Sequence, residues 1–421
     1  MKRGLRVSDD QIYLVPPPLD LAELTELAGL DRPELKYEPW SPVVNPRFAD
    51  LAEPDDLFAE IRRSDILVHY PYESFAQSFE VFLRAASRDP AAIGVKTTVY
   101  RTSDESPLVP ALIEAAEDGK QSVCLVELKA RFDERRNIEW SHRLEQAGVH
   151  VVYGFPHLKI HAKATLVVRR EGDSLQRYVH LGTGNYHAVT ARQYEDFGLF
   201  TADQQIAADV ADLFNYVTGF GRPQRFRKLL VAPFTLRDGL IERIRACAEA
   251  AAAGKPALIR FKLNALTDPA IIEELYAASQ AGVGIDVFAR SICSLRPGVK
   301  GLSDTIEVRS VVGRFLEHSR AFCFEAGDRS AWYIGSADLM PRNLDHRLEI
   351  VAPVEDARAQ QRLASVFDTL LEDNTAWRLG SDGAWTKLSP KKGDRPANAQ
   401  QSLMRTARRR RPAAHRLARK R

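Results

Sequence analysis

The hydrophobic pattern of the chain switches repeatedly between helical and strand-like spacing from about residue 56 onward. Phe75, Phe79, Phe82 and Leu83 recur with the spacing of one helical face, and short runs rich in Val, Ile and Leu follow between turn signals. In the first half the pattern predicts helices at 74–90, 107–119 and 138–148 and strands at 91–101, 122–130, 149–154, 158–170 and 177–184. Alternating helices and strands with short connections predict an α/β fold with a parallel or mixed sheet.

The second half repeats this order, with predicted strands at 256–263, 285–290, 306–312, 314–326 and 330–339 and a helix at 269–282. His161-Ala-Lys163 is matched by His318-Ser-Arg320, and the Gly-rich turn at 182–185 is matched at 335–338. The period is near 157 residues, the spacing from His161 to His318, which indicates paired domains rather than a solenoid. We therefore expect two tandem α/β domains from an internal duplication, at 56–222 and 223–385.

The segments that flank these domains differ in composition. Residues 1–55 carry scattered prolines and are interpreted as a connector or the remnant of an upstream domain. Residues 386–421 hold 13 Lys or Arg and one acid, a charge of +12, so the preceding residues carry −9 of the net +3. We expect this basic tail to be disordered. A solvated arm is the plain interpretation, and an arm that binds a polyanion is the alternative.

The overall composition, 45% hydrophobic and 27% charged, is sufficient to form hydrophobic cores. No run of 18 apolar residues and no apolar leader are present, which argues against a membrane span and a secretory signal. Four widely spaced cysteines without a CxxC pattern favour reduced thiols over disulfides or zinc ligands. These features predict a cytoplasmic protein, with peripheral attachment to a membrane left open.

The candidate chemistry centres on the two His-x-cation segments. In the predicted strand at 158–170, His161, Lys163 and Thr165 share one face because strand side chains alternate. The partner strand ends in the turn at 182–185, whose backbone N–H groups can form an anion-binding nest. Two such segments meet at a pseudo-twofold axis, where one imidazole can be a nucleophile and the other a general acid or base. For one strand alone, a structural His beside a surface Lys is the simpler interpretation.

Paired His-x-Lys strands resemble the phospholipase D superfamily, but the Asp that this superfamily places five residues after the Lys is Val168 here, and Arg320 replaces the second Lys. The chain resembles bacterial polyphosphate kinases more closely, over about residues 60–355. Eight segments in order carry this resemblance: VYRTSDES, VELKARFDE, AGVHVVYG, LKIHAK, YVHLGTGNYH, TARQYEDFGL, GRFLEHSR and SADLMPRNLD.

The resemblance implies reversible transfer of the terminal phosphate of ATP to inorganic polyphosphate through a phosphorylated histidine. It assigns the phosphorylated residue to His161 and a second histidine that contacts ATP and assists the transfer to His318. It places a tyrosine that packs on the adenine at Tyr194 and a phosphate-binding arginine at Arg290.

The resemblance also implies Mg²⁺ as cofactor, near Arg101 and Arg131. Because a guanidinium cannot ligate a cation, we interpret these two residues as phosphate clamps or as ligands through their backbone carbonyls. Phosphoryl transfer needs cations on the phosphate oxygens, and the further candidates are Lys163, Arg290, Arg320 and Arg347. His180 and Asn185 are candidate supporting contacts; for His180 the alternative is a buried, hydrogen-bonded side chain.

The resemblance implies two further domains upstream, so we expect an N-terminally truncated chain whose partners are ATP, ADP and polyphosphate, with a homo-oligomer left open. Two other functions compete with this one. A phospholipase D-like phosphodiesterase would need neither nucleoside triphosphate nor metal. An inactive remnant would bind polyphosphate or nucleic acid through the basic tail alone.

Overall fold

The computed structural model describes residues 24–49, 51, 53–100, 106–127, 134–155, 158–219, 221 and 225–410. The chain divides into a small unit that ends at Ser41 and a large unit that begins at Pro42. The small unit contains the short helix α2 (Thr25–Gly29) and the 3-10 helix η3 (Pro33–Leu35), and the side chains of both are exposed. Both predicted α/β domains lie in the large unit, which also begins with the 3-10 helix η4 (Pro46–Phe48).

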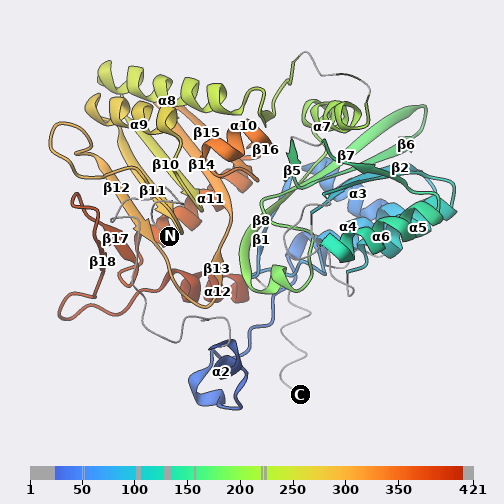
Figure 1. The fold of residues 1–421 in the computed structure, drawn as a ribbon, viewed down its shortest axis with the longest axis horizontal. Helices are drawn as coiled ribbons and strands as arrows, with labels where there is room; N and C mark the ends of the chain where they lie inside the picture. The colour runs from blue at the N-terminus through green and yellow to red at the C-terminus, as the bar shows by residue number, and fades with distance from the viewer. Residues whose placement is uncertain are drawn as a thin grey trace, which may run out of the picture. The chain divides into compact units, whose positions relative to one another are not determined.

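The first half is built on a mixed sheet with helices on both faces (Figure 1). Its strands, in spatial order, are β1 (Ile66–Tyr70), β8 (Tyr194–Thr201), β7 (Ser174–Gly182), β6 (Ala164–Glu171), β2 (Ala92–Val99), β3 (Gln121–Val126) and β4 (His150–Tyr153). β2, β3 and β4 are parallel and the other neighbours antiparallel. Its helices are α3 (Pro54–Arg63), α4 (Phe79–Arg88), α5 (Leu108–Glu117), α6 (Glu134–Gln146) and α7 (Gln204–Val217), with the 3-10 helix η5 (Thr190–Arg192) before β8.

Strand alternation explains why both faces of this sheet are covered. On β7, Tyr178 packs in the core beneath α3, α4 and α5, whereas the next residue, Val179, packs in a second core with α7. α4 buries the predicted apolar face with Phe79, Phe82 and Leu83. Each face of the sheet therefore carries a buried core.

The second half forms a ten-stranded sheet that includes one strand from the first half. Its strands, in spatial order, are β18 (Trp385–Lys387), β17 (Trp377–Leu379), β12 (Ile306–Ser310), β11 (Gly284–Ala289), β10 (Ala257–Leu263), β14 (Arg320–Ala326), β15 (Arg329–Gly335), β16 (Arg347–Val354) and β5 (Lys159–Ile160), with β9 (Leu230–Ala232) also paired to β16. Its helices are α8 (Leu236–Ala252), α9 (Pro269–Gln280), α10 (Pro341–His346), α11 (Ala357–Leu371) and α12 (Ala399–Arg409). α8 and α9 lie on the opposite side of this sheet from α11 (Figure 1).

The two halves exchange short strands. β5 pairs in parallel with β16 of the second half, and β13 (Leu316–Glu317) pairs in parallel with β8 of the first half. A hydrophobic cluster is shared across the same junction, because Ile160 and Val179 of the first half pack with Leu348 and Ile350 of the second. The predicted duplication is thus visible as a reciprocal pairing, and each exchanged strand ends directly before one of the two candidate histidines.

The continuous strand predicted at 158–170 is wrong in one respect that matters for the site. The chain is strand at β5 and again at β6, but not at His161–Lys163. The reason is that the backbone changes partners there: the N–H groups of His161 and Ala162 both bond to the carbonyl of Leu348, whereas β6 pairs with β2 and β7. The second segment breaks in the same way between β13 and β14.

The expected disorder of residues 386–421 is corrected for the part that the structure describes. Residues 386–410 are described, and α12 buries Gln400, Leu403 and Ala407. The helix forms because Asn398 caps its N-terminus and its apolar residues recur on one face, a pattern that the basic composition hid. Residues 411–421 lie outside the described part.

Residues before the predicted domain boundary at 56 also pack on the first domain. Val43 exchanges backbone hydrogen bonds with Tyr72 and Ser74, and Phe48 packs against Phe200 in the first core. Prolines in this segment obscured its apolar anchors. The helices α7 and α11 and the strands β8 and β16 were not predicted as elements, although they carry much of the junction between the halves.

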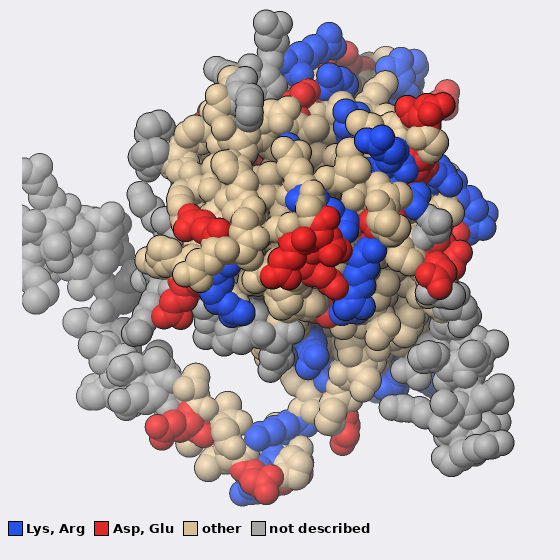
Figure 2. Space-filling view, turned by 90° about the vertical axis from the view of Figure 1, so that its right-hand side faces the viewer, with Lys and Arg blue, Asp and Glu red and all other residues tan. Residues whose placement is uncertain are grey.

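Charge and hydrophobicity outside the site are ordinary. On the face that belongs to the first half, acidic and basic side chains are interspersed (Figure 2). All four cysteines are free thiols, and three of them are buried. Among the residues that the structure describes, no helix is both long and apolar enough to cross a membrane.

Candidate active site

His161 lies where the chain passes from the second sheet to the first, and it faces a buried carboxylate. Its Nδ1 is 2.8 Å from Oε2 of Glu349, which is on β16 and fully buried. Burial, followed by the positive charges of Lys163, Arg347 and Arg320, holds the pKa of the His161 imidazole well below its usual range. A neutral ring that donates from Nδ1 to the ionised Glu349 carboxylate has its lone pair on Nε2.

The cation beside His161 is buried as well. Lys163 is 2% exposed, its ammonium donates to the backbone carbonyl of His161, and it lies 5.3 Å from the ring centre of Tyr100. Burial lowers the pKa of Lys163 to about 7, and burial raises the pKa of Glu349 to about 7, although each group opposes the shift of the other.

His318 occupies the equivalent position in the second half. Its Nδ1 lies 2.9 Å from both carboxylate oxygens of Asp196 on β8, and its side chain is 13% exposed. Burial lowers the pKa of His318, and Asp196 partly opposes this. The Tyr194 ring centre lies 5.2 Å from that of His318. Each histidine is thus oriented by a carboxylate from the other half of the fold.

Two arginines are held close to His318 by polar side chains. Arg320 donates through Nε and Nη2 to the two oxygens of Asp338, and its Nη1 donates to the carbonyl of His318 at 2.8 Å. Burial raises the pKa of the Asp338 carboxyl, but the charge and hydrogen bonds of Arg320 outweigh this and lower the pKa to about 2. Arg290 follows β11 and donates to Oδ1 of Asn264 at 2.9 Å. These contacts fix the guanidinium groups as rigid forks, the arrangement that suits phosphate oxygens.

The Gly-rich turn after β7 brings backbone close to Asp196. A Cβ on Gly184 would lie 2.1 Å from Oδ2 of Asp196, so glycine is required for this approach. Thr183 donates its hydroxyl to Oδ1 of Asp196 at 2.6 Å. The side-chain oxygen of Asn185 is buried and has no hydrogen-bond partner among the described residues.

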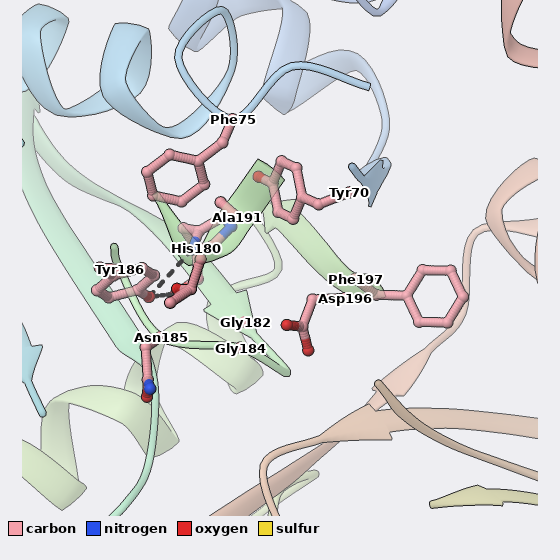
Figure 3. Close-up of a pocket in the computed structure, with 11 residues that line it drawn as sticks. Tyr70, Phe75, His180, Gly182, Gly184, Asn185, Tyr186, Ala191, Asp196 and Phe197 are labelled. Carbon is pink, nitrogen blue, oxygen red and sulfur yellow. Dashed lines mark hydrogen bonds between the residues drawn. The ribbon is translucent and has the colours of Figure 1, made fainter. Parts of the chain in front are cut away.

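His180 lies in a small pocket of about 10 Å³ behind this turn, lined largely by aromatic side chains (Figure 3). Its Nδ1 is 3.0 Å from the hydroxyl of Tyr186, and its ring packs against Phe79 and Phe200. Burial lowers the pKa of His180 to about 3. The surroundings of His180 are therefore those of the alternative interpretation, a buried histidine held by a hydrogen bond. Gly182 separates it from Lys163, since a Cβ there would lie 3.5 Å from both side chains.

The structure brings most of the predicted site residues together and leaves two undescribed. His161, Lys163, Arg320, Arg347 and His318 interact electrostatically, and Arg290 interacts with Tyr194 and Arg320. The predicted magnesium-site residues Arg101 and Arg131 lie outside the described residues.

The described residues do not furnish a ligand set for a metal ion. No group of three His, Cys, Asp or Glu side chains suited to a metal occurs in the part of the chain that the structure describes. The carboxylates of the site, Glu349, Asp196 and Asp338, each face a histidine or an arginine instead.

Sequence reasoning missed the two carboxylates that orient the histidines. Asp196 and Glu349 are third residues of β8 and β16, in YEDFGLFT and RLEIVAPV, where one or two acids precede an apolar run. An acid at the start of a buried strand was the available signal. Its meaning depended on the strand exchange, because β5 and β13 carry His161 and His318 to the strands of the opposite half.

Comparison with known proteins places this geometry in a family. The models of polyphosphate kinase C-terminal domain 1 and C-terminal domain 2 match residues 56–223 and 229–400. A polyphosphate kinase from Streptomyces coelicolor is 49% identical over 415 residues, which cover 97% of this chain and 55% of that protein. The chain thus spans about half the length of this relative.

Solved structures agree with the fold. The crystal structure of polyphosphate kinase from Porphyromonas gingivalis matches with a TM-score of 0.85 at 32% identity, covering 97% of this chain and 62% of that one. A phosphatidylserine synthase from Haemophilus influenzae matches with a TM-score of 0.50 at 11% identity over 82% of this chain and 93% of that one, a likeness of fold alone. The chain belongs to the polyphosphate kinase family and contains the two C-terminal domains of that family.

Proposed function

We propose that this chain transfers the terminal phosphate of ATP reversibly to inorganic polyphosphate through a phosphohistidine at His161. The observation that carries the proposal is the contact of His161 Nδ1 with the buried carboxylate of Glu349, surrounded by Lys163, Arg347 and Arg320. A neutral imidazole oriented in this way is a nucleophile at Nε2, and the cations around it suit a transferred phosphoryl group. We infer the substrates, ATP and polyphosphate, from the relatives, which are named polyphosphate kinases.

In the first step Nε2 of His161 attacks the terminal phosphorus, the P–N bond forms, the bond to the bridging oxygen breaks and ADP leaves. The proton on Nδ1 stays on the ring, and the Glu349 carboxylate compensates the positive charge that develops there. In the second step a terminal oxygen of polyphosphate attacks the same phosphorus and releases the imidazole. The reverse sequence makes ATP from ADP and polyphosphate.

His318 is oriented by Asp196 for a complementary role. With the Nδ1 proton held toward Asp196, Nε2 of His318 carries a lone pair, lies 3.3 Å from Nη1 of Arg320 and would accept a proton from the nucleotide phosphates. Arg290 and Arg320 would bind phosphate oxygens, and Tyr194 beside His318 would pack on the adenine. Mg²⁺ would accompany the triphosphate and neutralise part of its charge.

The test is incubation of the purified chain with ATP labelled at the terminal phosphate and Mg²⁺, followed by acid and alkali treatment. We expect a label on the wild-type chain that is acid-labile and alkali-stable, and no label on His161→Ala. His142→Ala changes an exposed histidine of α6 and serves as the matched control.

A folded wild-type chain that takes up no label would contradict the proposal. Label that persists in His161→Ala would place the phosphoryl carrier elsewhere. Hydrolysis of a phosphodiester substrate in EDTA would instead support the phosphodiesterase alternative.

A further inference from the structure

The two histidine segments are related by duplication, but their buried surroundings differ. The pairing of β5 with β16 and of β13 with β8 matches His161 to His318 and Glu349 to Asp196. Four further positions are matched in the same frame, the last of them by the registers of β2 with β6 and of β10 with β14. The first site carries an uncharged side chain at each of them, and the second a charged or hydroxyl group: Ile160 against Glu317, Ala162 against Ser319, Leu348 against Glu195 and Thr98 against Lys262.

These residues of the second site form one buried polar cluster behind His318. The ammonium of Lys262 lies 2.5 Å from Glu195, 2.9 Å from Glu317 and 2.9 Å from the hydroxyl of Ser319. Glu195 also accepts hydrogen bonds from the backbone N–H groups of His318 and Ser319, and it contacts Nε2 of His69 at 2.6 Å. The backbone that carries His318 is thus tied directly to charged side chains.

The helix α12 closes this cluster through one side chain, Gln400, which is 1% exposed. Its Oε1 accepts from the N–H of Phe315 at 3.0 Å, and its Nε2 donates to the carbonyl of Phe315 at 2.9 Å. The same Nε2 donates to Oε1 of Glu317 at 2.7 Å. The amide therefore pairs with the backbone just before His318 as a neighbouring strand would.

The position of Gln400 is itself fixed. The N–H of Ala399 donates to Oδ2 of Asp373 at 2.8 Å, and Asn398 caps the helix by accepting from Gln401. A helix end held in this way cannot slide without breaking both caps. The three hydrogen bonds of Gln400 go to the segment that precedes His318.

We propose that Gln400 is a positioning residue for His318: through Phe315 and Glu317, α12 sets the place of the imidazole that faces the nucleotide. The expected change in KM for ATP rests on the proposed function. The expected displacement of His318 does not. A buried charged cluster is stable only when every donor and acceptor is satisfied. Loss of the amide leaves Phe315 N–H and C=O unpaired and removes a donor from Glu317, so the segment that carries His318 shifts.

Two variants approach this amide from opposite sides. Gln400→Ala removes it, and Gly313→Ala displaces it, because a Cβ on the exposed Gly313 would lie 2.4 Å from Oε1 of Gln400. Gln401→Ala, at the exposed neighbouring position of the same helix, is the matched control. A thermal transition for each variant reports whether it folds.

The first measurement needs no activity. In the full chain labelled with ¹⁵N-histidine, the side-chain resonances of His318 are assigned by their loss in His318→Asn. We expect Gln400→Ala and Gly313→Ala to shift these resonances while those of His161 stay in place, and Gln401→Ala to change neither. The second measurement is labelling of His161 as a function of ATP concentration, in which we expect KM for ATP to rise about 10-fold and kcat to change less than threefold.

Unchanged His318 resonances in both variants would overturn the proposal, and so would an equal shift at His161 and His318. If Gln400→Ala fails to fold, Gly313→Ala decides, since the substituted residue is exposed and the Gln400 side chain is kept. A wild-type chain that takes up no label refutes the proposed function, and the resonance measurement then still decides whether Gln400 positions His318.

Discussion

At the residue scale, burial is what separates the histidines of the site from ordinary surface histidines. His161 and His318 are withdrawn from water and each faces one carboxylate, so each is a neutral ring with a defined tautomer at pH 7. The lone pair on Nε2 then does not depend on a proton exchange with solvent. The chemistry follows from Glu349 and Asp196 as much as from the histidines.

Replacement of Glu349 by Gln tests this at His161. The amide keeps the shape of the side chain but removes the negative charge that compensates the ring during transfer. We expect the rate of His161 labelling from ATP to fall at least about 100-fold, as when a buried carboxylate behind a catalytic histidine is neutralised. Rapid-quench labelling measures this, with Glu372→Gln at an exposed position as control. A rate within threefold of wild type would show that Glu349 does not orient the nucleophile.

His180 gives a prediction about stability and pH. Burial lowers its pKa from 6.5 to about 3, so below pH 6.5 the unfolded chain takes up a proton that the folded chain does not. The contribution of the neutral His180 to the free energy of unfolding is therefore present above pH 6.5 and is lost as the pH falls. The free energy of unfolding falls by about 2 kcal/mol between pH 6.5 and pH 5. Urea unfolding at several pH values should show a shallower pH dependence for His180→Gln than for wild type. His150→Gln, at an exposed position, should leave the slope unchanged, and equal slopes for all three chains would refute the assignment.

At the element scale, the decisive features are the strands that stop at the site. β5 and β13 are two residues long, and each ends because its backbone leaves one sheet and joins another. The strands that receive them, β16 and β8, must therefore be held firmly. β16 pairs with β15 over Val351–Val354, where Gly335, the last residue of β15, opposes Val351.

Gly335→Ala tests how tightly this pairing is packed. A Cβ at Gly335 would lie 2.4 Å from the backbone oxygen of Ile350 and 2.8 Å from Cα of Val351, and backbone cannot move aside cheaply. We expect the free energy of unfolding to fall by about 3 kcal/mol. Gly284→Ala, at the start of β11, is the control, because its nearest neighbour would be a Leu258 methyl group at 3.4 Å. Chemical denaturation measures both, and equal losses would contradict the packing argument.

At the scale of the whole molecule, the two halves are interlocked and not merely adjacent. They exchange strands, share one hydrophobic cluster and supply carboxylates to each other's histidines. The ion pair of Arg362 on α11 with Glu73, at 2.6 Å, adds a further link between them. An arrangement of this kind is expected to open as one cooperative unit.

Hydrogen exchange followed by mass spectrometry tests this cooperativity. If the halves unfold together, Gly335→Ala in the second half should lower the opening free energy of β6 and β7 as much as that of β14 and β15. The wild-type chain under identical conditions is the reference. Weakened protection confined to β14 and β15 would show that the halves unfold independently.

The sequence by itself determined the local structure and the reactive residue types. Apolar periodicity located α4, α5, α9 and most central strands, because a face that must be buried leaves its period in the sequence. The repeat at His161 and His318 indicated the duplication. Residue type and the family resemblance together made Lys163, Arg290, Arg320 and Arg347 the predicted phosphate-binding cations.

Only the tertiary structure decided how these residues act together. It ended the predicted strand at His161, because backbone pairing across the junction left no local signal. It selected Glu349 and Asp196 from 56 acidic residues, because what distinguishes them is which strand arrives beside them. It also folded part of the basic tail into α12 and brought Gln400 to the backbone before His318. Contacts between residues far apart in the chain depend on packing, and packing is a property of the whole fold.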